Sequence, residues 1–203
     1  MNRLVVLMGT KGMGKSTLIR AWADRHPRVL WLDPMLEEVA AAGAGNIAVD
    51  LDELYDLLDA RAGLDRWRIV YVGEPETYGE AVAMLQPATP RDQGYARALG
   101  GVTVACGEAD LLAPNSGALH PAVRALIHRG RHYGINLLAA VRRPAEVARD
   151  LTSQADLVVL FRLSEPRDLA FVRAFVGKSI AAEVSGLARF AYVTYSPGQP
   201  LDP

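Results

Sequence analysis

The chain has 203 residues, of which 50% are hydrophobic and 22% charged, a balance typical of a folded globular protein rather than a disordered one. The formal net charge of -1 excludes a generally basic nucleic-acid binder, so any DNA contact needs a local patch, a pore or another subunit. The single cysteine, Cys106, excludes an internal disulfide and a cysteine-based zinc cluster. We find neither an apolar run near the roughly 20 residues that span a bilayer nor a secretory signal, so we expect no intrinsic membrane segment and an intracellular location.

Apolar runs of strand length recur along the chain, and their unbroken character predicts strands buried on both faces of a largely parallel sheet. In chain order these runs are Leu4–Met8, Arg28–Leu32, Arg68–Val72, Val102–Cys106, Ile135–Val141 and Leu157–Phe161, with Phe190–Tyr195 as a last strand at the sheet edge. Helical patterns fill the gaps, and we expect the helix after the sixth strand to end at Gly177. The alternation predicts an α/β, three-layer fold with a mainly parallel central sheet flanked by helices. We expect one domain over residues 1–196 and a C-terminal tail over 197–203.

The strongest motif lies between the first strand and the first helix. Residues 9–16 read GTKGMGKS, a full match to the phosphate-loop pattern G-x-x-x-x-G-K-[ST]. Its glycines let the backbone approach a phosphate, Lys15 is expected to bridge the β- and γ-phosphates of ATP, and Ser16 to place its hydroxyl on Mg²⁺. The alternative, a glycine-rich turn that matches by chance, is disfavoured by the flanking strand and helix, so the expected α/β fold is a three-layer P-loop NTPase fold. The expected cofactor-binding residues are Gly9, Thr10, Lys11, Gly12, Met13, Gly14, Lys15, Ser16 and Thr17, although the motif does not require the Lys11 side chain, which we expect in solvent.

Acidic residues follow two of the predicted strands. Gly107 and Glu108 come after Val102–Cys106, and Glu74 comes after Arg68–Val72. Motor NTPases usually place Asp-Glu at such a strand end, the Asp to support Mg²⁺ and the Glu to orient the attacking water. Here Gly107 occupies the Asp position, so Glu108 is the candidate base and a candidate metal-shell residue. We prefer Glu108 because we expect Glu74 further from the phosphate loop; the alternative for either is a solvated loop acid.

Asp33, after the second strand, is a weaker candidate for the missing metal support. The segment RGRHYGINLLAAVRRPAEV adds arginines on both sides of the fifth strand. Arginine can stabilise charge on a phosphoryl group within its own chain or from a neighbouring one. Arg129 and Arg131 are candidate catalytic residues acting on a neighbouring subunit, and Arg142 is a candidate sensor in its own chain. The alternative for each arginine is an ordinary surface residue.

The order of these segments resembles the FtsK–HerA superfamily of DNA-pumping ATPases, and within it the small viral genome-packaging ATPases. The resemblance extends from GTKGMGKS to FVRAFVG and is most specific in RGRHYGINLLAAVRRPAEVARDLTSQADLVVLFRLSEPRDLAFV. It implies ATP and Mg²⁺ as cofactors, a homo-oligomeric ring, usually a hexamer, with ATP sites at subunit interfaces, and double-stranded DNA in the pore. The implied function is ATP-driven packaging of a viral genome into a preformed capsid, with a capsid or membrane vertex protein as a further partner, in the host cytoplasm or associated with the virion.

Two departures from the family pattern leave the rate and the metal dependence of hydrolysis open: Arg142 where Gln is usual, and Gly107 where Asp is usual. We expect none of the additional domains of cellular chromosome translocases, which favours the packaging function. Two alternatives remain. In a P-loop small-molecule kinase, Arg142 and Arg143 would belong to an acceptor-binding lid. A non-catalytic, Zot-like phage assembly protein would commonly have a transmembrane segment, which the sequence does not predict.

Overall fold

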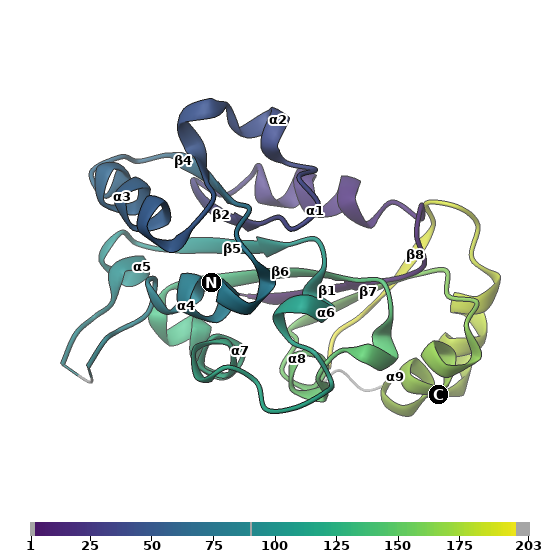
Figure 1. The fold of residues 1–203 in the computed structure, drawn as a ribbon. Coiled ribbons are helices and arrows are strands. Elements are labelled where there is room, and N and C mark those ends of the chain that lie inside the picture. The colour runs from purple at the N-terminus through teal and green to yellow at the C-terminus, as the bar shows by residue number, and fades with distance from the viewer. Residues whose placement is uncertain (1–2, 90, 198–203) are drawn as a thin grey trace.

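The computed structural model describes residues 3–89 and 91–197, and within them eight strands form one sheet (Figure 1). The strands are β1 (Leu4–Met8), β2 (Arg28–Leu32), β3 (Ile47–Ala48), β4 (Trp67–Tyr71), β5 (Val102–Cys106), β6 (Ile135–Val141), β7 (Leu157–Phe161) and β8 (Tyr192–Tyr195). Their order is β3-β4-β2-β5-β6-β1-β7-β8, and every pairing is parallel except that of β8 with β7. The mainly parallel sheet and the edge position of the last strand are therefore confirmed.

Helices cover both faces of the sheet, which confirms the three-layer fold (Figure 1). They are α1 (Lys15–Ala23), α2 (Val39–Ala42), α3 (Leu51–Arg61), α4 (Tyr78–Ala83), α5 (Tyr95–Ala98), α6 (Ala109–Leu112), α7 (Pro121–Tyr133), α8 (Arg149–Ser153) and α9 (Pro166–Gly186), with 3-10 turns η1 (Ala44–Asn46), η2 (Pro75–Thr77) and η3 (Pro144–Glu146). Ile19 and Ala23 of α1 pack into one apolar cluster with Leu7 of β1. The opposite face packs against Leu126 of α7 and Val172 of α9. Burial of both faces explains why the strands read as unbroken apolar runs.

The structure corrects four details of the sequence prediction. The predicted strand Arg68–Val72 is Trp67–Tyr71, one residue earlier, and the last strand begins at Tyr192 and not at Phe190, which lies in a turn. Gly177 does leave the helical conformation, with φ 84° and ψ 176°, but a second helical segment continues to Gly186. It continues because Ala181 and Val184 give it a buried apolar face. The short strand β3 has only two residues and no periodic signal, so the sequence pattern did not reveal it.

Of the predicted tail, 197–203, only Pro197 belongs to the described residues. Within 3–89 and 91–197, no helix combines the length and the apolar character needed to cross a bilayer.

Candidate active site

Three neighbouring strands bring the candidate residues to one edge of the sheet. In the order β5-β6-β1, Gly9 follows β1, Glu108 follows β5 and Arg142 follows β6. The parallel register pairs Met8 with Val141, so the phosphate loop and Arg142 begin at the same level. Glu74 follows β4, which β2, β5 and β6 separate from β1, and its side chain is exposed. The expectation that Glu74 lies further from the phosphate loop than Glu108 is therefore confirmed.

The phosphate loop has the backbone geometry that its glycines predict. Gly12 and Gly14 have φ angles of 78° and 104°, in the left-handed region that favours glycine. Gly14 then begins α1 as its N-cap residue. A Cβ atom on Gly9 would lie 2.6 Å from Cβ of Phe161 in β7, so only glycine lets the loop leave β1 beside β7. Three glycines thus shape a turn whose N–H groups precede a helix N-terminus, an arrangement that binds anions.

Lys15 lies buried inside this loop, with only 7% of its surface exposed. Its Nζ donates hydrogen bonds to the carbonyl oxygens of Gly9 (2.7 Å) and Thr10 (3.0 Å). Burial lowers the pKa of Lys15 to about 8, and the negative charge of Glu108 opposes this shift. These two contacts hold the ammonium group within the loop. A phosphate bound by the loop amides would therefore lie within reach of the Lys15 charge.

The remaining loop residues divide between solvent and core. Lys11 is exposed, as expected. Met13 is buried in the apolar cluster beneath α1, so its side chain anchors the loop and only its backbone is available to a phosphate. Thr10 donates from both its amide and its hydroxyl to the carbonyl oxygen of Arg162, at 3.1 Å each. Ser16 and Thr17 are exposed on the first turn of α1, where a hydroxyl can reach a nucleotide-bound cation.

Glu108 and Arg142 form an ion pair, with 2.6 Å between Oε2 and Nε. Only 8% of Glu108 is exposed, and burial raises the pKa of its carboxyl, whereas the charges of Arg142 and Lys15 lower it. A buried carboxylate beside the phosphate loop, with its pKa moved toward neutrality, suits a general base. Arg142, expected as a sensor, is thus the direct partner of the candidate base.

The position where the family pattern has Asp is open. A Cβ atom on Gly107 would meet no atom within 4 Å, so no steric conflict explains the missing side chain. The suggested substitute, Asp33, is already engaged: its two carboxylate oxygens accept from the backbone N–H groups of Glu37 (3.1 Å) and Glu38 (2.7 Å). Asp33 therefore holds the loop after β2 and is not a free metal ligand.

No group of three or more His, Cys, Asp or Glu side chains suited to a metal lies within the described part of the chain. Mg²⁺ that arrives with a nucleotide needs only one or two protein oxygens, because phosphates and water complete its shell. The exposed Ser16 hydroxyl and the Glu108 carboxylate supply that oxygen chemistry at the loop, so the residues fit a nucleotide-bound Mg²⁺.

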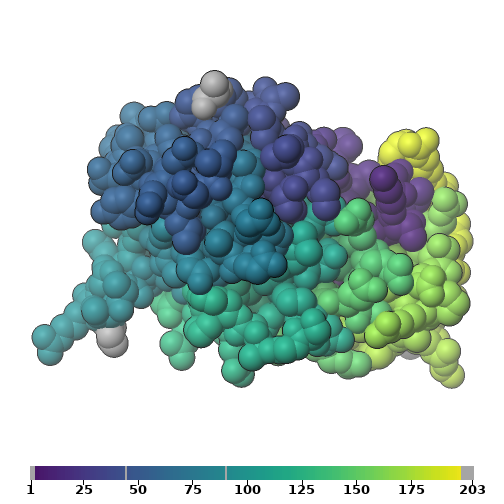
Figure 2. All heavy atoms as spheres, viewed as in Figure 1, coloured from purple at the N-terminus to yellow at the C-terminus, as the bar shows by residue number. Residues whose placement is uncertain are grey.

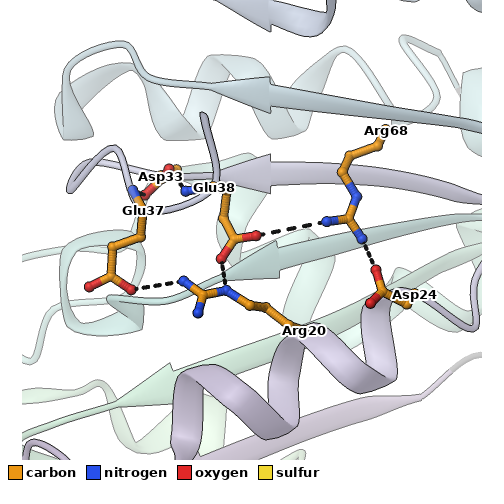
Figure 3. Close-up of polar contacts among 6 residues, drawn as sticks. All are labelled: Arg20, Asp24, Asp33, Glu37, Glu38 and Arg68. Carbon is orange, nitrogen blue, oxygen red and sulfur yellow. Dashed lines mark hydrogen bonds and ion pairs between the residues drawn. The ribbon is translucent and has the colours of Figure 1, made fainter. Parts of the chain in front are cut away.

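A charged network next to the site was not foreseen from the sequence. Its members come from α1 and its C-cap residue, the loop after β2, and β4: Arg20, Asp24, Asp33, Glu37, Glu38 and Arg68 (Figure 3). Arg20 on the phosphate-loop helix pairs with Glu37 at 3.2 Å and also with the buried Glu38. Arg68 pairs with Asp24 and lies 3.8 Å from Glu38. The network thus links α1 to the loop that follows β2.

Two further acids lie near the site, and the sequence pattern alone gives neither of them a role. Asp110, two residues beyond Glu108, acts through its negative charge to raise the pKa of Lys15, and its Oδ1 is buried without a hydrogen-bond partner among the described residues. Asp168 is buried in α9 and accepts from the amide of Ala145 at 3.0 Å, with Nε of Arg143 at 3.4 Å. Asp168 thus holds the turn that immediately follows Arg142. The EAD and PRDL sequences were the available signals for these two acids.

Arg129 and Arg131 lie elsewhere. Both are exposed at the C-terminal end of α7, the helix that immediately precedes β6. Arg131 lines a cavity with Leu4 and Ile135, the first residues of β1 and β6. The two arginines are therefore at the amino edge of the sheet, opposite the phosphate loop. The structure does not bring them to the site of their own chain.

No protein-family model matches the chain, and no curated protein matches it. Solved structures share its fold. The genome packaging NTPase B204 from Sulfolobus turreted icosahedral virus 2, in complex with AMP, is 21% identical with a TM-score of 0.74, over 96% of this chain and 92% of that one. B204, the DNA-packaging ATPase from Sulfolobus turreted icosahedral virus, is 22% identical with a TM-score of 0.72, over 97% and 94%. These structural neighbours confirm the fold expected from the resemblance to viral packaging ATPases.

A more distant match is the N-terminal domain of zonular occludens toxin from Neisseria meningitidis, 16% identical over 78% of this chain and 76% of that one. Its TM-score of 0.43 is too low to support an inference about this chain.

Proposed function

We propose that this chain is an ATP-driven translocase of double-stranded DNA that packages a viral genome into a preformed capsid. The observation that supports this most directly is the convergence, at one edge of the sheet, of a phosphate loop containing the buried Lys15 with the Glu108–Arg142 pair. The fold on which they converge is shared over nearly the whole chain with a genome packaging NTPase. Structures of that NTPase with AMPPCP and with ATP-gammaS support ATP as the nucleotide here.

In this proposal the loop amides and Lys15 hold the β- and γ-phosphates. Lys15 exchanges its contacts with the Gly9 and Thr10 carbonyls for phosphate oxygens. Ser16 and Glu108 would hold the Mg²⁺ that accompanies ATP, and the cation would neutralise phosphate charge. Glu108 accepts a proton from water as the water oxygen bonds to the γ-phosphorus and the bond to the leaving ADP oxygen breaks. The contact with Arg142 involves only Oε2 of Glu108, so Oε1 can accept this proton, and the arginine charge lowers the pKa of the base.

A ring accounts for two otherwise unplaced features. The net charge of -1 gives the chain no general attraction for DNA, whereas a ring can concentrate basic side chains in a pore. In a head-to-tail ring, the amino edge of one subunit can meet the carboxyl edge of the next. Arg129 and Arg131 are exposed at that amino edge, and each can complete the neighbouring site as a charge-stabilising arginine. We expect a hexamer, with a capsid or membrane vertex protein as a further partner, in the host cytoplasm or on the virion.

The test mixes two inactive variants and measures ATP hydrolysis with double-stranded DNA, alongside molar mass in solution. Lys15→Ala removes the phosphate contact, and Arg129→Ala or Arg131→Ala removes the proposed trans arginine, at a cost of about 10³- to 10⁵-fold in rate. In mixed rings some interfaces pair an intact loop with an intact arginine, so activity should partly return. Arg124→Ala, an exposed arginine on the same helix, is the matched control and should hydrolyse ATP normally.

Three results would contradict the proposal. A monomer that transfers phosphate to a nucleoside, without stimulation by DNA, would establish the kinase alternative. A ring that binds ATP but never hydrolyses it would favour the assembly-protein alternative. Mixed rings without any recovered activity would remove the trans role of both arginines.

A further inference from the structure

The two sides of the phosphate loop are chemically different, which orients a bound nucleotide. Glu108 and Arg142 lie on the β5-β6 side of β1, so the γ-phosphate must point toward that side for hydrolysis. The nucleoside end then points the other way, toward β7 and β8. The nucleobase can therefore contact side chains that lie beside the loop near β7 and β8. This inference rests on the proposed ATP-dependent function.

A turn between α9 and β8 lies in that position. The amide of Ala191 donates to the carbonyl oxygen of Ala188 at 3.1 Å, which closes the turn. Arg189 Nε donates to the carbonyl oxygen of Gly12 at 3.3 Å, a contact between residues 177 positions apart. Figure 2 shows the C-terminal segment, in yellow, beside the purple N-terminal part of the chain that contains the phosphate loop. The turn is thus attached directly to the loop.

Phe190, at the tip of this turn, has an unusual conformation. Its φ is 69°, and Leu36 is the other non-glycine residue in the described part of the chain with a positive φ. Backbone strain of this kind persists where the surroundings impose it, often at ligand sites. A Cβ atom on Gly14 would lie 3.0 Å from Cδ1 of Phe190, so the ring borders the residue that begins α1. The guanidinium of Arg189 lies 4.6 Å from the ring centroid.

The strained backbone directs a large apolar side chain outward and not into the core. Although Arg189 covers part of the ring, 59% of Phe190 is exposed. An exposed aromatic face beside a phosphate site offers what a nucleobase needs, because base–aromatic stacking depends on a flat π surface. The arginine on the ring adds a cation–π contact that fixes the ring in place.

We propose that Phe190 is the base-stacking residue of the nucleotide site, that the purine of ATP lies on its exposed face, and that Arg189 positions it by binding both the ring and Gly12. The ligand class is a purine nucleoside triphosphate whose phosphates occupy the adjacent loop. Phe190 contributes to affinity for the base and has no contact with the phosphates.

The test compares binding of Mg-ATP with binding of Mg-tripolyphosphate, which has the same phosphate chain and no base. Phe190→Ala should weaken ATP binding by about 5- to 150-fold, the range expected for loss of one base–aromatic stack, and leave tripolyphosphate binding within about twofold. Phe190→Tyr should retain ATP affinity, because it keeps the ring. Tyr55→Ala, an aromatic residue that is 62% exposed on α3, is the control and should change neither affinity.

Equal losses for ATP and tripolyphosphate, or no loss for either, would overturn the stacking role. Phe190→Trp gives a second readout that does not depend on the alanine variant folding: ATP should quench the added tryptophan fluorescence, and tripolyphosphate should not. If wild-type protein binds both ligands equally, the base subsite is wrong while the packaging ATPase proposal stands. If base-dependent binding is lost in Phe190→Ala but DNA never stimulates wild-type hydrolysis, the subsite stands and the translocase proposal fails.

Discussion

Titration of the buried Lys15 should make the nucleotide-free protein more stable as the pH rises from neutral. Burial lowers its pKa from 10.5 to about 8. Below about pH 8 both folded and unfolded chains hold the proton, so the full cost of burying the charge is present. Between about pH 8 and 10.5 the unfolded chain keeps the proton while the folded chain loses it. Since the unfolded chain then binds more protons, linkage requires the unfolding free energy to rise with pH.

The two pKa values set the size of the effect. They predict that the contribution of Lys15 to the unfolding free energy increases by about 2 kcal/mol between pH 7 and pH 9.5. Urea denaturation across this range, for wild type and for Lys15→Met, isolates the contribution because methionine does not titrate. Other alkaline groups affect both proteins equally, including Cys106, whose thiol pKa burial raises to about 12.

Parallel pH profiles for wild type and Lys15→Met would refute the argument, because they would show that Lys15 is not desolvated as the structure has it. Nucleotide binding provides an independent check. The phosphates favour the charged ammonium, so ATP binding should take up a proton, and ATP affinity should fall about tenfold between pH 7 and pH 9. Calorimetry in buffers of different ionisation enthalpy measures that proton uptake.

Glu108→Gln should slow hydrolysis by about 10²- to 10⁴-fold with ATP still bound, since the amide cannot accept a proton, whereas Glu74→Gln should turn over normally; a larger effect at Glu74 would contradict the assignment of the base. Arg142→Gln should move the acid limb of the ATPase pH profile to higher pH, because the arginine charge lowers the pKa of Glu108 and its removal lets that pKa rise. An acid limb at the same pH would show that Arg142 does not influence the pKa of the base. Gly107→Asp should fold with an unchanged melting temperature, because its Cβ meets no atom within 4 Å, and should lower the Mg²⁺ concentration needed for half-maximal ATP binding; a titration without any such shift would mean that the position does not face the cation.

Much of the fold followed from the sequence alone, because burial leaves a local signal. β1, β2, β5, β6 and β7 have the bounds that their apolar runs predicted, since a strand covered on both faces must be apolar throughout. The phosphate loop was equally clear, because its glycines and Lys15 are contiguous and each meets a separate geometric demand. The expectation that Glu108 lies nearer the loop than Glu74 also agrees with the strand order.

What the sequence could not provide were contacts between distant segments. Strand order determines that β6 separates β1 from β5, and it thereby pairs Arg142 with Glu108, but strand order leaves no trace in a local pattern. The same holds for Asp33, which looked free in sequence but accepts two backbone hydrogen bonds. Arg189 reaches Gly12 only because β8 pairs with β7 beside the loop. Composition and periodicity indicate whether a residue is buried. Which residue it contacts depends on how the chain brings distant segments together, and only the tertiary structure determines that.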